Sequence, residues 1–284
     1  MTKEELIEVY KEVKSDLSMG IYEYQGELFP IDPRGPEAVK SESKRLRTSG
    51  LLKEDDRMYE NFEKTYIYAE NIDFIEKALE MTSREPYTAV LNPASATRAG
   101  GGVRNGSKAL EETICRRSNL LIGLEKFAKE SGEYNPPLSQ LELIWTPLVS
   151  IYRDSSYKTM PKPKTINVIT AAALNHPSLN LDFTFQKNQE DLMKKKIRMV
   201  LRQAIQIGIV SLVLPAWGCG AFKCPAKEVA RCFDEVFKEP EFTGAFMEIC
   251  FAILDDRNAT HEFNPEGNFK PFLDRFGKKP LSLK

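Results

Sequence analysis

Histidine is scarce in this 284-residue chain, which has only His176 and His261. The five cysteines include no C-x-x-C pair, and no H-E-x-x-H run occurs, so a zinc site has little support. No apolar run approaches the roughly 20 residues of a membrane-spanning helix. The charged N-terminal segment does not read as a signal peptide, and the odd cysteine count favours reduced thiols. We expect a soluble, cytoplasmic protein without a bound metal or a membrane anchor.

The chain also lacks a large net charge of either sign. The chain has 40 basic and 41 acidic residues, a net charge of -1, which argues against a polycation that grips nucleic acid through charge alone. With 42% hydrophobic residues it can build a core. One local stretch is positive. We expect a solvated helix face there, and attraction of a polyanionic substrate is the alternative; the stretch comprises Lys194, Lys195, Lys196, Arg198 and Arg202.

Strand and helix patterns alternate along most of the sequence. Periodicity predicts helices at 3–17, 72–81, 108–129, 188–207 and 225–237. It predicts a hairpin at 21–31, strands at 65–70, 87–92, 141–147, 166–173 and 247–256, and at 210–222 a strand that ends in a glycine loop. The charged residues 32–63 are expected to form a solvated surface segment. Such alternation indicates an α/β fold with a central sheet covered on both faces, an N-terminal extension at 1–64 and a main domain at 65–284.

A glycine-rich loop follows the predicted strand at 87–92. Gly100, Gly101 and Gly102 permit positive φ and a close approach of the backbone to a ligand, and their N–H groups suit a phosphate or pyrophosphate. The loop matches neither a Walker A motif nor G-x-G-x-x-G. Glu111 and Glu112 open the helix that follows. By themselves they are best explained as partners of the helix dipole, whereas beside a ligand one of them could act as a general acid.

A second glycine loop follows the strand near residue 214. Gly218 and Gly220 would expose N–H groups near the start of the 225–237 helix, which predicts another anion site. Phe222 could pack against a ribose or a base, whereas Trp217 is expected in the core. Cys219 has no identifiable basic partner, so we expect a small loop residue and not a nucleophile.

Taken together, the motifs resemble the microbial-type poly(ADP-ribose) glycohydrolase family, a branch of the macrodomain fold. The resemblance covers nearly the whole chain. It comprises N-x-A-S-A-T-x-x-G-G-G at 92–102, the Glu-Glu pair that ends ten residues after Gly102, I-T-A-x-x-x-N at 169–175, L-x-A-W-G-C-G-x-F at 214–222 and the phenylalanine-rich run at 242–255. It implies a macrodomain-like three-layer α/β/α sandwich with a mixed central sheet and an N-terminal helical extension, so the main domain would be a macrodomain-type catalytic domain.

The resemblance also implies residue roles in cleavage of a ribose–ribose O-glycosidic bond. Glu112 corresponds to the catalytic acid and Glu111 to a ribose-binding partner, with no cofactor required. The substrate-binding residues would be Ser95, Gly100, Gly101, Gly102, Val103, Gly218, Cys219, Gly220, Ala221 and Phe222. The implied partner is ADP-ribose or poly(ADP-ribose) on modified proteins. We expect no sequence-specific nucleic acid binding, and a monomer.

One position departs from the family pattern. The family has Q-E-E after the glycine loop, whereas Leu110 precedes the two glutamates here. Two alternatives therefore stand beside the glycohydrolase, namely a hydrolase of mono-ADP-ribose and a module that binds ADP-ribose without cleaving it.

Overall fold

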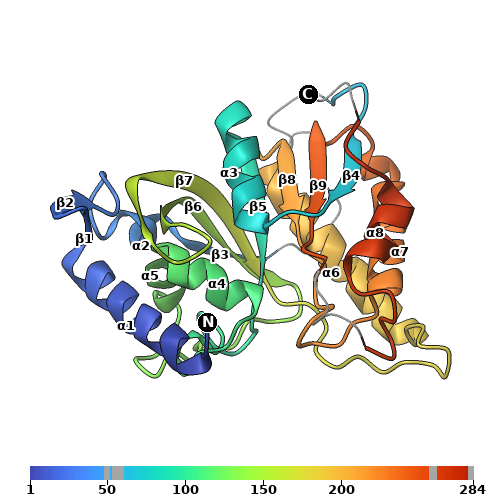
Figure 1. The fold of residues 1–284 in the computed structure, drawn as a ribbon. Coiled ribbons are helices and arrows are strands. Elements are labelled where there is room, and N and C mark those ends of the chain that lie inside the picture. Colours follow the sequence, from blue (N-terminus) through green and yellow to red (C-terminus); the bar gives the residue numbers. More distant parts are fainter. Residues whose placement is uncertain (48–51, 53–60, 256–260, 281–284) are drawn as a thin grey trace. The chain divides into compact units, whose positions relative to one another are not determined.

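The computed structural model describes residues 1–47, 52, 61–255 and 261–280 (Figure 1). The chain forms two compact units, each assembled from segments that are separated in the sequence. Unit 1 comprises Met1–Arg45, Asn92–Ser139 and Leu143–Ala171. Unit 2 comprises Leu46–Leu91, Gln140–Glu142 and Ala172–Lys284. The division at residue 64 stays a prediction.

Helices and strands alternate along the chain, as expected. The helices are α1 (Lys3–Met19), α2 (Ala38–Glu42), α3 (Phe74–Arg84), α4 (Leu110–Arg117), α5 (Leu120–Glu125), α6 (Lys187–Gln206), α7 (Ala226–Phe237) and α8 (Phe269–Phe276), with the short 3₁₀ helices η2 (Val103–Asn105) and η3 (Pro240–Phe242). The strands are β1 (Ile21–Tyr24), β2 (Glu27–Pro30), β3 (Lys44–Arg47), β4 (Tyr66–Glu70), β5 (Thr88–Pro93), β6 (Glu142–Arg153), β7 (Thr159–Ala171), β8 (Ser211–Leu214) and β9 (Glu248–Ala252).

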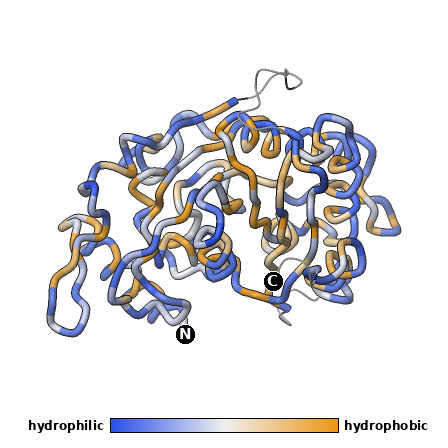
Figure 2. Tube along the Cα trace, turned by 90° about the horizontal axis from the view of Figure 1, so that it is seen from above, coloured by the Kyte–Doolittle hydropathy of each residue, from blue (hydrophilic) through white to orange (hydrophobic). Residues whose placement is uncertain are grey.

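A seven-stranded mixed sheet has the strand order β3-β6-β7-β5-β8-β9-β4, and β1 and β2 form a separate antiparallel pair. The pairs β5/β8, β8/β9 and β4/β9 are parallel, whereas β6/β7 is antiparallel. Helical coils alternate between hydrophobic and hydrophilic colours (Figure 2), as amphipathic helices on a sheet require. The predicted α/β class with a mixed central sheet is confirmed.

In unit 1, helix α1 begins with a capping box. Thr2 Oγ1 accepts the Glu5 N–H, and the Glu5 carboxylate accepts the Thr2 N–H. The helix ends at Gly20, which has φ of +72°. The hairpin that follows turns at Gln25 and Gly26, both with positive φ, as the right-handed strand twist favours in a two-residue turn. The predicted hairpin is confirmed.

The predicted helix at 108–129 is wrong in one respect, because it is interrupted. Helix α4 ends at Arg117. The next residue, Ser118, is extended with φ of -150°, and its hydroxyl donates to the Ile114 carbonyl. The Asn119 side chain then accepts the Ser150 N–H at 2.8 Å. Hydrogen bonds between these two polar side chains and the backbone outcompete the continuous helix.

Strands β6 and β7 extend well beyond their predicted ranges. The first half of β7 carries Pro161, Lys162, Pro163 and Lys164, and it is mostly exposed. Prolines and charged residues make a strand harder to predict from the sequence. The sheet tolerates them here because the pairing of β7 with β6 is irregular and this part of β7 is exposed to solvent. The two strands, which pair as antiparallel neighbours, are consequently longer than the hydrophobic pattern predicted.

Unit 2 is organised around parallel strands. Every residue of β8 and β9 is buried, which explains why both read as continuous apolar runs. Helix α3 packs on β8, α8 packs on β4, and α6 lies against α7 (Figure 1). Trp217 is fully buried, with its ring 6.4 Å from that of Phe233, which confirms the prediction that it belongs to the core.

The charged segment 32–63 is only partly described. It contributes α2 and β3, so its described part is more structured than a solvated loop, while residues 48–51 and 53–60 lie outside the described residues. The end of the predicted strand at 247–256 also falls there. In the described part of the chain, no helix combines the length and the apolar character needed to cross a membrane.

Candidate active site

The first glycine loop follows strand β5 and leads to helix α4, and the loop itself lies in unit 1. Gly100 and Gly101 have φ of +70° and +55°, and the loop then turns through η2. A Cβ atom at Gly101 would lie 2.5 Å from Glu112 Oε1 and 2.9 Å from Glu111 Oε2. Glycine is therefore required here by φ and by the two carboxylates that the backbone passes.

Glu112 lies in the first turn of α4 and is buried. Its Oε1 accepts the Gly102 N–H at 2.7 Å. Its Oε2 is also buried, and among the described residues it has no hydrogen-bond partner. One oxygen therefore fixes the carboxyl group, while the other is left for chemistry.

Glu111 is held at both oxygens. Oε2 accepts the Ser95 N–H at 2.7 Å and Oε1 accepts the Gly100 N–H at 3.1 Å. Burial raises the pKa of Glu111 well above its ordinary value, and Glu112 raises it further whenever Glu112 is ionised, whereas the two N–H donors oppose the shift. Glu111 is thus a fixed acceptor that shapes the loop, in contrast to the half-free Glu112.

These contacts change the role of the loop amides. The N–H groups of Gly100 and Gly102 were expected to meet a phosphate, but they donate to the chain's own glutamates. Ser95 Oγ accepts the Thr97 and Arg98 N–H groups, each at 3.2 Å, and so shapes the loop. Val103 is fully buried beneath it.

The second glycine loop follows β8 within unit 2. Gly218 has φ of +82°, and a Cβ there would lie 2.7 Å from the Ala173 Cβ and 2.9 Å from the Cys224 Sγ. Cys219 is buried, and burial raises the pKa of its thiol well above the ordinary value. A buried thiol of high pKa is a poor nucleophile, in agreement with the interpretation of Cys219 as a small loop residue.

Several amides of this second loop remain available. In the described ranges of the chain, the N–H groups of Gly218, Gly220, Ala221 and Phe222 make no hydrogen bond. Phe222 is half-buried, and its carbonyl accepts the His176 N–H at 2.8 Å. A cluster of successive free N–H groups is suited to an anion such as a pyrophosphate.

The start of α7 is less available than the sequence suggested. The Ala226 N–H donates to Asn264 Oδ1 at 2.6 Å, and Asn264 is itself buried. Asn264 lies 38 residues further along the chain, so no local pattern could have identified it. The N–H groups left free for a ligand in this region are therefore those of the loop, whereas this first helical N–H is occupied.

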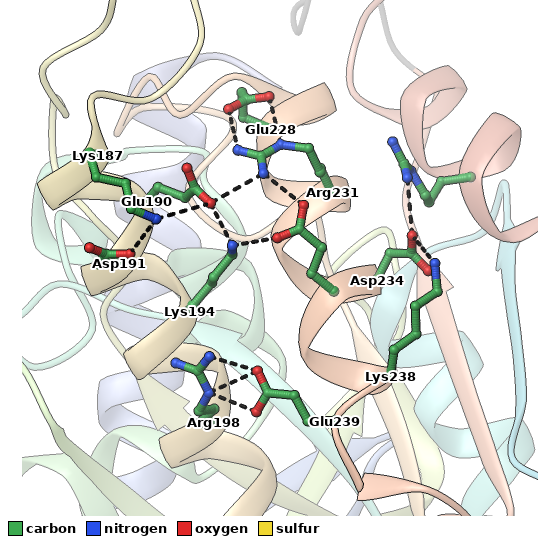
Figure 3. Close-up of polar contacts among 12 residues, drawn as sticks. Lys187, Glu190, Asp191, Lys194, Arg198, Glu228, Arg231, Asp234, Lys238 and Glu239 are labelled. Atoms are coloured by element: carbon green, nitrogen blue, oxygen red, sulfur yellow. Dashed lines mark hydrogen bonds and ion pairs between the residues drawn. The ribbon is translucent and has the colours of Figure 1, made fainter.

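The positive stretch on α6 is largely neutralised (Figure 3). Lys194 pairs with Glu190 and Glu235 of unit 2. Arg198 and Arg202 pair with Glu239 and Glu241 at 2.6 and 2.5 Å. Lys196 is buried, which leaves Lys195 as the exposed member of the stretch. The network gives little support to attraction of a polyanion by this helix.

The structure describes no group of three or more His, Cys, Asp or Glu side chains that could hold a metal ion within residues 1–47, 52, 61–255 and 261–280. The absence of a cofactor stays a prediction.

The sheet, the two glycine loops and the glutamate pair define a protein of the macrodomain class. A family model for the macro domain matches residues 167–233, and a model described as microbial-type PARG, catalytic domain, matches residues 24–154. These matches agree with the resemblance to the microbial-type poly(ADP-ribose) glycohydrolase (PARG) family that the motifs predicted.

Solved structures share the fold. Poly(ADP-ribose) glycohydrolase from Thermomonospora curvata superposes with a TM-score of 0.80 at 23% identity, over 96% of this chain and 100% of that one. The enzyme from Deinococcus radiodurans in complex with ADP-ribose gives a TM-score of 0.65 at 26% identity, over 84% of this chain and 95% of that one.

Curated relatives match only in part. An uncharacterized protein of Pyrococcus horikoshii is 40% identical over 55 residues, which are 19% of this chain. Another, of Thermococcus kodakarensis, is 29% identical over 70 residues, or 25% of this chain. The chain spans 29% and 39% of the lengths of these two relatives.

Proposed function

We propose that this chain is a poly(ADP-ribose) glycohydrolase that hydrolyses ribose–ribose O-glycosidic bonds and releases ADP-ribose. The observation that carries the proposal is the arrangement of Glu112, with Oε1 held by the Gly102 N–H and Oε2 buried and unpartnered. The family, and the ADP-ribose bound to the Deinococcus enzyme, support the choice of substrate.

The mechanism assigns a proton to the unpartnered oxygen. Glu112 Oε2 donates it to the departing 2′-oxygen of one ribose as the bond from that oxygen to C1″, the anomeric carbon of the other ribose, breaks and oxocarbenium character develops at C1″. The resulting carboxylate takes a proton from water as that water adds to C1″, which restores the protonated acid. The Gly102 N–H keeps Oε1 in place throughout, so Oε2 is presented in one orientation.

The remaining site residues bind the substrate. Glu111, fixed by Ser95 and Gly100, accepts a ribose hydroxyl. The free amides of Gly218, Gly220, Ala221 and Phe222 bind the pyrophosphate, and the Phe222 ring packs beside the ribose. The substrate is polymer on modified proteins, and the protein acts as a cytoplasmic monomer without sequence-specific nucleic acid binding.

The test is ADP-ribose release from an auto-poly(ADP-ribosyl)ated acceptor. Glu112→Gln keeps the size of the side chain and a carbonyl oxygen for the Gly102 N–H, but it removes the acid. A general acid contributes roughly 10²–10⁴-fold, so the variant should lose activity by that factor while it retains ADP-ribose binding. A loss smaller than tenfold would contradict the role of Glu112.

The substitution of the family glutamine supports a second candidate. Leu110 is half-buried at the start of α4 and can donate no hydrogen bond to the site. Tight ADP-ribose binding without product release from mono- or poly-modified targets would make this chain a binding module. Release from mono-modified targets alone would make it a mono-ADP-ribosyl hydrolase.

A further inference from the structure

A buried arginine lies one helical turn beyond Glu112. Arg116 is on α4 and has no exposed side-chain surface. Its Nε donates to the Leu6 carbonyl of α1, and its Nη2 donates to the Val103 carbonyl of η2, each at 3.2 Å. Its Nη1 has no hydrogen-bond partner among the described residues.

The hydrogen-bond partners of Arg116 are unusual for a buried cation. Both are neutral backbone carbonyls. Burying a charge without a carboxylate in hydrogen-bond contact is costly, and an apolar side chain of similar volume would fill the same space at lower cost. A planar guanidinium, however, holds two acceptors in a fixed relative orientation, which neither an apolar side chain nor a lysine can do. The geometry thus favours a positioning role over simple packing.

The two carbonyls connect Arg116 to the active site. Val103 directly follows Gly102, whose N–H holds Glu112 Oε1. Arg116 therefore joins the helix that carries the acid to the loop that carries the donor to that acid. Its third attachment is to α1, a helix that supplies no residue to the reaction described above.

Two other contacts bring α1 against the same loop. At Gly106, with φ of +73°, a Cβ would lie 2.5 Å from the Lys3 carbonyl oxygen. The Arg104 guanidinium lies 6.0 Å from the centre of the Tyr10 ring and donates to the Ala99 carbonyl at 3.1 Å. Helix α1 thus meets η2 through its first turn and through Tyr10, in addition to Leu6.

We propose that α1 is a structural part of the active site and that Arg116 is a positioning residue, which together hold η2 and the Gly102 N–H in register with Glu112. This inference rests on the proposed function. It predicts that loosening these contacts impairs the chemical step and spares substrate affinity, because the amides assigned to pyrophosphate lie in a different segment.

The first experiment compares Arg116→Met and Arg116→Lys with the native protein. Both variants should lower kcat about tenfold or more, with KM for polymer and Kd for ADP-ribose within twofold. Lysine should not restore kcat, because a single ammonium group cannot hold two carbonyl acceptors in the fixed orientation that the planar guanidinium imposes. A folded Met variant with native kcat, or equal losses in kcat and affinity, would overturn the inference.

The second experiment uses a matched pair of glycines and keeps Arg116 intact. Gly106→Ala and Gly26→Ala introduce similar strain, at φ of +73° and +83°, but a Cβ at Gly26 meets nothing within 4 Å. Gly106→Ala should push α1 away from the loop and lower kcat about fivefold or more, whereas Gly26→Ala should leave kcat unchanged. Equal kcat values in the two variants would argue against a role of α1.

A third measurement does not depend on turnover. Amide hydrogen exchange at Gly102 reports whether its N–H is held by Glu112. Exchange should be faster in Arg116→Met and Gly106→Ala than in the native protein and in Gly26→Ala. If the native protein released no ADP-ribose, the proposed function would fail, yet this exchange would still decide the positioning role; unchanged exchange would refute it.

Discussion

Lys196 is an ionisable side chain buried in the interior of unit 2, and we therefore expect the stability of the protein to depend measurably on pH. Its side chain is buried, and Nζ donates to the Gln140 carbonyl at 2.8 Å and to the Ala172 carbonyl at 3.0 Å. Burial lowers the pKa of Lys196 from 10.5 to about 8. The unfolded chain therefore binds this proton more tightly than the folded protein does.

The direction and size of the effect follow from linkage. Between pH 8 and 10.5 the unfolded state holds the proton that the folded state has lost, so the free energy of unfolding rises with pH across that window. At about 1.36 kcal/mol per pKa unit, the whole difference corresponds to about 3 kcal/mol. Most of this gain, about 2.5 kcal/mol, falls between about pH 7 and pH 10.

Urea unfolding of the native protein and Lys196→Met at several pH values isolates this contribution. The Lys196→Met variant also leaves two carbonyls without a donor. The resulting loss of stability is nearly constant with pH, so it does not affect the slope of the free energy of unfolding against pH. Lys195→Met serves as the control, because it removes the same charge from the exposed neighbouring position. As the pH is raised, the free energy of unfolding of the native protein should increase relative to that of Lys196→Met. It should change in parallel with that of Lys195→Met. Parallel curves for all three proteins would refute the reasoning.

Two further predictions concern the first loop and the α6–α7 network. Gly101→Ala would place a Cβ 2.5 Å from Glu112 Oε1 at a φ of +55°, so turnover should fall at least tenfold. Gly35→Ala, where a Cβ meets nothing within 4 Å, should retain native turnover, and equal rates for the two variants would count against this prediction. Hydrogen bonds from Lys194 and Arg231 lower the pKa of Glu190 to about 2. Its contribution to stability should therefore be complete above pH 4.5 and vanish toward pH 2. Melting temperatures of the native protein and Glu190→Gln should accordingly converge on acidification, and a gap that stays constant would show that Glu190 does not titrate in this way.

Much of the fold could be predicted from hydrophobic pattern, because the pattern is local. Helices α6 and α7 match their predicted ranges within one residue, since each has one apolar face over its whole length. Strands β8 and β9 were found because every one of their residues is buried, whereas β4 was found from its alternating pattern. Helix α8 was missed; its sequence has a proline in the third position, and its apolar side is defined by packing against residues such as Phe251.

The candidate site could be located from sequence, but its hydrogen bonds could not. Glycines followed by a glutamate pair identify the first loop, and the second loop was found in the same way. The side chains that accept hydrogen bonds from the loop N–H groups lie ten or more residues away in the sequence. Glu112, for example, accepts the Gly102 N–H. The partners of Arg116 and Asn264 are equally distant in sequence, so they follow from tertiary packing alone.

The pairing of the first loop with Glu111 and Glu112 has a consequence for anion selectivity. A glycine loop with free amides would attract inorganic phosphate, sulfate or any small carboxylate in the medium. Here the Gly100 and Gly102 amides are already occupied by carboxylates of the same chain, so this part of the site is closed to such competitors. Of the two glycine loops, the second has the free amides at which buffer anions can compete. Under the proposed mechanism, the ionic composition of the solution should therefore affect substrate affinity at the second loop and leave the Glu112 carboxyl group unaffected.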